Sequence, residues 1–119
     1  MFGYGMELVL PYPPSVNTYW RSNRGRVHIS AKGRAYREQV GWIVKQSGQT
    51  FGDRQVAIRI ELFPPDARRR DLDNACKGLL DALEHGGLFD DDSQICDLHL
   101  IRREIMRPDG QARVTVVAA

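Results

Sequence analysis

The chain has 119 residues, of which 42% are hydrophobic and 27% charged, and its formal net charge is +2. This length and apolar content predict a single domain over residues 1–119 with its own core, and they exclude a mainly disordered chain. No run approaches the ~20 apolar residues of a membrane span, and the start of the chain lacks a signal-peptide pattern. Two cysteines cannot build a disulfide scaffold. We therefore expect a soluble, reduced, cytoplasmic protein with no membrane partner.

The charges are segregated along the chain, although their sum is small. Fourteen of the 17 basic residues are arginine, whose planar guanidinium binds phosphate through two parallel hydrogen bonds. Residues 21–37 carry six basic side chains and no acidic one, whereas residues 71–92 carry seven acidic side chains and Lys77. Opposed blocks of this kind indicate a polyanion-binding surface beside an acidic pocket.

The first quarter of the chain predicts little regular structure. Residues 6–10 read as a short strand that the prolines at 11, 13 and 14 end. Residues 15–25 are polar, and we expect an irregular segment there. Residues 27–29 are consistent with another short strand.

The central part predicts a helix and a strand. Ser30 is a suitable N-cap and Gly48 a suitable end for a helix. Its core-facing stripe follows helical spacing and consists of Tyr36, Val40, Ile43, Val44 and Ser47. Residues 55–63 then alternate apolar and polar side chains, which predicts a half-buried strand ended by two prolines.

A second helix is predicted after the segment 71–74. Its apolar stripe is Leu72, Cys76, Leu79, Leu80 and Leu83, and the two glycines at 86 and 87 provide its end. Residues 94–106 and 112–118 favour strands, and the turn at 107–110 predicts that they pair as an antiparallel hairpin. The order strand, strand, helix, strand, helix, strand, strand predicts an α+β fold, with two helices on a mixed sheet.

The chemistry-bearing residues cluster around the start of the second helix. Asp71 and Asp73 stand two apart at its beginning, three arginines (68–70) precede them, and Lys77 follows one helical turn after Asp73. The acidic run 90–92 leads into the next strand. If that strand pairs beside the strand before the helix, the run could return to the start of the helix, so that three or four carboxylates converge.

Clustered carboxylates with open positions suit Mg²⁺, which accepts phosphate oxygens as further ligands. The arginines would hold the phosphate, and Lys77 would stabilise charge that develops during hydrolysis. Each part also has a simpler interpretation: Asp71 or Asp73 as a helix N-cap, the acidic and arginine runs as solvated segments, and Lys77 as a surface lysine.

The sequence resembles the RusA family of Holliday junction resolvases, small phage- and prophage-associated endonucleases. The resemblance runs nearly end to end. Its most specific part is the block Arg-Arg-Arg-Asp-Leu-Asp-Asn at 68–74 with Lys77 and the Asp-Asp-Ser-Gln at 91–94. The matching segments are 13–17 with Tyr19 and Arg21, 23–26 with His28 and Ser30, 35–37, 65–66, 68–74, and 81–83. The sequence departs from the family pattern at Ala67, where an arginine is often found, and at Asp90, which adds an acid.

The resemblance implies a Mg²⁺-dependent homodimer that resolves four-way junction DNA by paired nicks during recombination and repair. It implies catalytic roles for Asp71, Asp73, Asp92 and Lys77, with the three aspartates as metal ligands and Asp91 as an additional candidate. The expected DNA contacts are Asn17, Tyr19, Arg21, Arg24, Arg26, Lys32, Arg34, Arg68, Arg69 and Arg70. Two alternatives stay open: a module that binds junctions without cutting them, and a less selective metal nuclease acting on forks, flaps or RNA.

Overall fold

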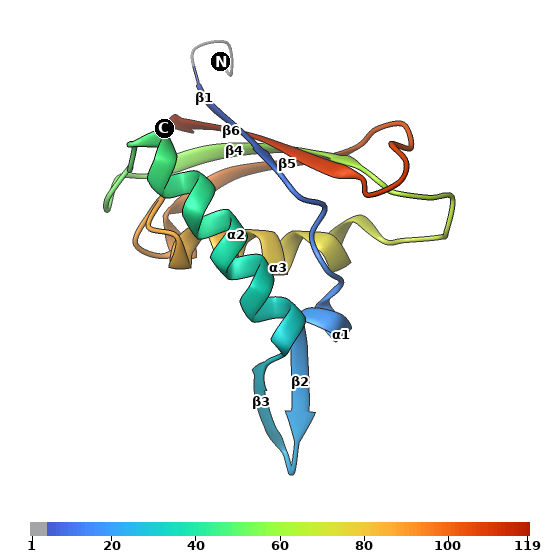
Figure 1. Cartoon of the computed structure of the whole chain (residues 1–119). Coiled ribbons are helices and arrows are strands. Elements are labelled where there is room, and N and C mark those ends of the chain that lie inside the picture. The colour runs from blue at the N-terminus through green and yellow to red at the C-terminus, as the bar shows by residue number, and fades with distance from the viewer. Residues whose placement is uncertain (1–4) are drawn as a thin grey trace.

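The computed structural model describes residues 5–119 and contains a four-stranded mixed sheet with two long helices on one face (Figure 1). The strand order is β1-β6-β4-β5. The strands are β1 (Met6–Leu10), β4 (Val56–Phe63), β5 (Ile95–Arg102) and β6 (Gln111–Ala118). The long helices are α2 (Ala31–Ser47) and α3 (Leu72–His85). Their buried stripes pack with the inward side chains of the sheet into one hydrophobic core, which confirms the predicted α+β class.

Helix α2 begins and ends where the sequence predicts. The Ser30 hydroxyl accepts a hydrogen bond from the Gly33 backbone N–H at 3.0 Å, so it caps the first turn. Gly48 ends the helix with a φ of 69°, a left-handed conformation that glycine adopts without strain. Tyr36, Val40 and Val44 are buried on the stripe between them.

The C-terminal strands do not pair with each other, which corrects the predicted hairpin. β5 and β6 run in opposite directions, but β4 lies between them, parallel to β5 and antiparallel to β6. The reason is burial: the side chains of β4 at 56, 58, 60 and 62 are at most 1% exposed. Such a strand satisfies its backbone groups best with a partner on each side. Helix α3 is the crossover that connects the two parallel strands.

Residues 15–25 are regular rather than irregular, which corrects a second expectation. They form α1 (Val16–Tyr19) and β2 (Trp20–Asn23), and β2 pairs with β3 (Arg26–Ile29) in a separate two-stranded sheet. Arg24 and Gly25 make the turn, with φ values of 52° and 76°. We call residues 20–29 the arm, because they project away from the main sheet (Figure 1). Most of the arm is exposed, so its strands show no apolar alternation that could reveal them.

Within residues 5–119, no helix is long and apolar enough to cross a membrane.

Candidate active site

Asp71 and Asp73 lie at the N-terminus of α3, where the chain leaves the sheet side and enters the helix. Asp71 occupies the N-cap position with an extended ψ of 141°, yet its side chain makes no capping hydrogen bond. Asp73 lies in the first turn, and both residues are exposed. The N-cap interpretation therefore does not account for Asp71, whose carboxylate oxygens are available to a ligand.

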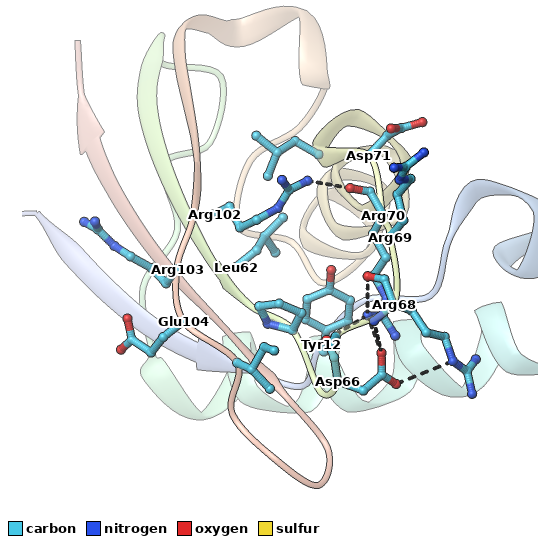
Figure 2. Close-up of a pocket in the computed structure, with 14 residues that line it drawn as sticks. Tyr12, Leu62, Asp66, Arg68, Arg69, Arg70, Asp71, Arg102, Arg103 and Glu104 are labelled. Carbon is cyan, nitrogen blue, oxygen red and sulfur yellow. Dashed lines mark hydrogen bonds and ion pairs between the residues drawn. The ribbon is translucent and has the colours of Figure 1, made fainter.

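A pocket of about 530 Å³ adjoins Asp71, and five of its 14 lining residues are arginines (Figure 2). We call it the arginine pocket. Its charged and aromatic lining residues are Tyr12, Asp66, Arg68, Arg69, Arg70, Asp71, Arg102, Arg103 and Glu104. Figure 2 shows Asp71 at the rim, with its carboxylate directed away from Tyr12. Five guanidinium groups in one concave surface create a positive field suited to a phosphodiester.

Asp66 orients the arginine segment. Its carboxylate accepts a hydrogen bond of 2.7 Å from Arg70 Nη1 and one of 3.0 Å from the Arg68 backbone N–H. These contacts, led by the Arg70 hydrogen bond, lower the pKa of Asp66 to about 2. The Arg70 guanidinium also lies 5.7 Å from the centre of the Tyr12 ring. Asp66 thus forms ion pairs with Arg70 and, at 3.8 Å, with Arg68.

The other side of the arginine segment faces α1. A second pocket of about 520 Å³ there contains Ser15, Thr18, Asp71 and Asn74. One turn further along α3, the exposed Lys77 lines a groove with Asn17 and Arg21 at the base of the arm. A band of polar side chains, three residues apart along α3, thus runs from the arginine pocket toward the arm: Asp71, Asn74 and Lys77. The structure brings these predicted residues onto one side of the molecule.

The basic residues of the arm and of the first turn of α2 form two groups. Arg21, Lys32 and Arg34 line one hollow together with His28, next to the N-terminus of α2. Arg24 lies in the turn at the tip of the arm, Arg26 begins the strand after it, and both are exposed. All of these side chains are accessible to a polyanion, as the sequence predicts.

Tyr19 does not fit its predicted role as a DNA contact. It is 0% exposed, and its hydroxyl donates a short hydrogen bond to the Asp81 carboxylate. Arg37 Nε donates to the same carboxylate at 2.8 Å and to the Tyr19 hydroxyl at 3.2 Å. Burial, followed by the Asp81 hydrogen bond, raises the pKa of Tyr19. Tyr19 therefore anchors α1 to α3 instead of meeting a ligand.

Asp92 lies far from Asp71 and Asp73 within one chain, which corrects the expected convergence. β5 does pair beside β4, but in parallel, so the acidic run returns to the start of β4 and the last turn of α3. The backbone N–H of Asp92 donates to Glu84 Oε1 at 2.9 Å. The 14 residues of α3 separate this point from Asp71 by roughly 20 Å. There the carboxylates of Glu84, Asp91 and Asp92 have oxygens within 4.8 Å of one another.

Asp91 has a structural role in this turn. Its carboxylate accepts a hydrogen bond from the Ser93 backbone N–H at 3.0 Å and caps the short 3-10 helix η1 (Asp92–Gln94). Gln94 Oε1 accepts from the Asp91 N–H at 2.7 Å, which completes a capping box. The Ser93 contacts lower the pKa of Asp91. Turn geometry thus explains Asp91, Ser93 and Gln94 locally, whereas Asp92 contributes only backbone groups to these contacts.

Three residues of the arginine pocket escaped sequence reasoning: Tyr12, Arg102 and Arg103. Arg102 pairs in register with Leu62 at the end of β4, and its Nη2 donates a short hydrogen bond to the Arg70 carbonyl. Arg103 Nε donates to Glu61 Oε2 at 2.8 Å. The place of Arg102 and Arg103 in the pocket depends on the parallel pairing of β4 and β5, and no local motif encodes that pairing.

Comparison with known proteins identifies the family of this chain. The family described as Endodeoxyribonuclease RusA matches residues 11–117. Among curated relatives, "Crossover junction endodeoxyribonuclease rusA" of Enterobacteria phage HK97 is 47% identical over 111 residues, and that of Enterobacteria phage 82 is 46% identical. "Crossover junction endodeoxyribonuclease RusA" of Escherichia coli (strain K12) is 44% identical. Each of these matches covers 92% of both chains.

Proposed function

Because this chain belongs to the RusA family of endodeoxyribonucleases, we propose that it is a crossover junction endodeoxyribonuclease, which hydrolyses phosphodiesters in Holliday junctions. The observation that carries the proposal is the two exposed carboxylates at the start of α3, Asp71 at the arginine pocket and Asp73 two residues later. A protein that only shields DNA gains nothing from acidic groups beside its phosphate contacts, since they repel the backbone. The pair thus favours cleavage over the binding-only alternative.

The residues at the start of α3 fit Mg²⁺ as the cofactor. Asp71 and Asp73 offer hard oxygen donors, and the Asp71 side chain is not used in capping the helix. Two carboxylates leave room for water and for phosphate oxygens around such an ion. When bound there, Mg²⁺ would polarise the scissile phosphate and lower the pKa of a coordinated water.

The other groups bind and position the DNA. Arg68, Arg69 and Arg70 hold the phosphates on one side of Asp71, and Asp66 keeps the Arg70 guanidinium in place. Lys77, on the arm side, stabilises charge that develops on the phosphate during cleavage. The arm carries Arg21, Arg24 and Arg26 along the neighbouring duplex.

The proposed enzyme acts as a homodimer. A four-way junction presents two equivalent scissile phosphates, and a two-fold dimer presents two equivalent sites. Asp92, which the family resemblance suggests as a third ligand, lies at the far end of α3 from Asp71 in its own chain. In a dimer, a second copy can supply it.

Cleavage assays on defined DNA test the function. The protein is incubated with a four-way junction, a fork and a linear duplex of equal length, each with Mg²⁺ or with chelator. We expect symmetric nicks in the junction that require Mg²⁺. Equal cutting of all three substrates would favour the less selective nuclease, and binding without cutting would favour the shielding module.

The Asp73→Asn variant tests the site. We expect cleavage to fall by roughly a thousandfold, because a bound metal contributes several kcal/mol to such a reaction. Junction binding should persist, since the arginines remain. The matched control is Asp53→Asn, an exposed aspartate in the turn before β4. Full activity of Asp73→Asn would contradict the assignment.

A further inference from the structure

The arm carries an exposed apolar side chain that phosphate binding does not explain. Val27 in β3 is 71% exposed, more than Val9, Trp42, Leu98 or Ile105. Its neighbours along the arm are polar or basic. A single exposed apolar side chain is ordinary on a protein surface, so Val27 becomes informative only through the other apolar side chains that lie around it.

Val27 forms one wall of a groove of about 630 Å³, which we call the arm groove. Its apolar lining comes from Val16, Trp20 and Val27, which belong to three different elements. Its polar lining is Asn17, Arg21, Ser22 and Lys77. The groove thus combines apolar side chains from α1 and the arm with two cations, Arg21 and the proposed catalytic Lys77.

The walls of the groove are held firmly. The Trp20 ring packs edge-on against Tyr19, with ring centres 4.9 Å apart, and the Arg37 guanidinium lies 5.7 Å from its centre. The Ser30 hydroxyl bonds the Tyr19 carbonyl at 3.0 Å and so ties the base of the arm to α2. Because these side chains are already held in place, a flat ligand that binds beside Trp20 loses less side-chain conformational entropy on binding.

The charge around the arm groove indicates which kind of ligand it binds. Arg21 and Lys77 line the groove, and residues 17–37 around it contain six basic side chains and no acidic one, so the groove attracts an anion. A nucleotide has this combination, since its base is flat and apolar on both faces and its phosphate is anionic. In continuous duplex DNA the bases are stacked and cannot enter, whereas stacking is interrupted where strands branch.

We propose that the arm groove binds an unstacked nucleobase at the branch point of DNA, with Val27 and Trp20 against the base and Arg21 and Lys77 on its phosphates. This inference rests on the proposed function and extends it, because it makes Val27 a specificity-determining residue. The base seated beside Lys77 would place the adjoining phosphate toward Asp71, on the same band of α3.

The test compares Val27→Thr and Val27→Ala with Val9→Thr, a matched control at a 50% exposed valine on β1. Threonine keeps the β-branched shape while replacing a methyl by a hydroxyl. Full-length proteins are titrated, without divalent metal, with a four-way junction that carries 2-aminopurine at the branch point or in the middle of one arm. Fluorescence reports unstacking of the labelled base.

We expect the native protein and Val9→Thr to raise the fluorescence at the branch point only. Both Val27 variants should lose most of this rise, and their preference for the junction over a linear duplex should fall by roughly fivefold to tenfold, the lower part of the range for base stacking on side chains. Their affinity for linear duplex should stay within about twofold, because the arginines are unchanged.

Three results would overturn the inference. The first is an unchanged rise and preference in both Val27 variants. The second is an equal loss in Val9→Thr. The third is a change in oligomeric state, measured by light scattering, that accompanies the loss and marks the groove as a protein interface. Failure of the proposed function looks different, since the native protein would then not cut the junction in Mg²⁺.

Discussion

At the residue scale, Tyr19 connects the arm to the helix that carries the candidate active site. Its ring lies against the backbone of Gly78, and its hydroxyl binds Asp81 one turn later on α3. Arg37 from α2 completes the contact through the Asp81 carboxylate, at 2.8 Å. A neutral hydroxyl, a carboxylate and a guanidinium therefore hold three helices together at one point. This arrangement requires that Tyr19 stays protonated.

The alkaline stability of the protein should report this contact. The pKa of Tyr19 is raised in the folded state, so its stabilising effect is complete below about pH 10, the unfolded value, and is lost as the pH rises above it. We expect the urea midpoint of the native protein to fall more steeply between pH 9.5 and 11 than that of Tyr19→Phe. Tyr36, also with a raised pKa, is common to both proteins and cancels. If the urea midpoints of the two proteins fell equally with pH, the role given to Tyr19 would be contradicted.

At the element scale, the close approach of α1 to α3 depends on a glycine inside a helix. A Cβ at Gly78 would lie 2.8 Å from Cδ2 of the Tyr19 ring, closer than any normal contact. Glycine in the middle of a helix costs about 1 kcal/mol relative to alanine, so helix propensity disfavours it at this position. Packing against Tyr19 is the reason for its presence.

Two glycine-to-alanine substitutions separate the effect of side-chain packing on stability from the effect of helix propensity. We expect Gly78→Ala to lower the free energy of unfolding by about 1–3 kcal/mol, because the new methyl displaces the Tyr19 ring. We expect Gly41→Ala in α2 to raise it by about 0.5–1 kcal/mol, since its Cβ would meet Gly86 at an ordinary 3.7 Å. Urea denaturation at neutral pH measures both. A Gly78→Ala protein at least as stable as the native one would show that the ring can move aside freely.

The elements that could be predicted from the sequence are those whose burial is periodic. The stripe of α2 and the alternation of β4 follow directly from side chains that must avoid water. The strand neighbours could not be predicted in the same way, because alternation reveals which face of a strand is buried but not which strand lies beside it. That is why the hairpin prediction for β5 and β6 was wrong.

At the scale of the whole molecule, the separation of Asp92 from Asp71 concerns the assembly. The two residues belong to opposite ends of α3, and no side-chain rotation spans that length. If Asp92 serves the site proposed at Asp71 and Asp73, it does so from a second copy. The homodimer and the role of Asp92 are then one proposal with one test.

Mixed dimers provide that test. We expect Asp73→Asn and Asp92→Asn each to be inactive alone, and their equimolar mixture to recover about a quarter of native nicking. Half of the exchanged dimers are mixed, and each mixed dimer has one intact site and one doubly substituted site. Subunit exchange is verified with two differently tagged native proteins. An inactive mixture after verified exchange would place the whole site within one chain, whereas full activity of Asp92→Asn alone would remove Asp92 from it.

The sequence by itself determined the α+β class, the two long helices and the segregated charges. Each of these depends on local periodicity or composition, which any fold of the chain must satisfy. Only the tertiary structure decided that Tyr19 is buried, that Arg102 and Arg103 join the arginine pocket, and that Asp92 lies at the far end of α3. These facts depend on the parallel pairing of β4 with β5 and on the docking of α1 against α3. Both come from the free energy of packing distant segments, which no short stretch of sequence contains.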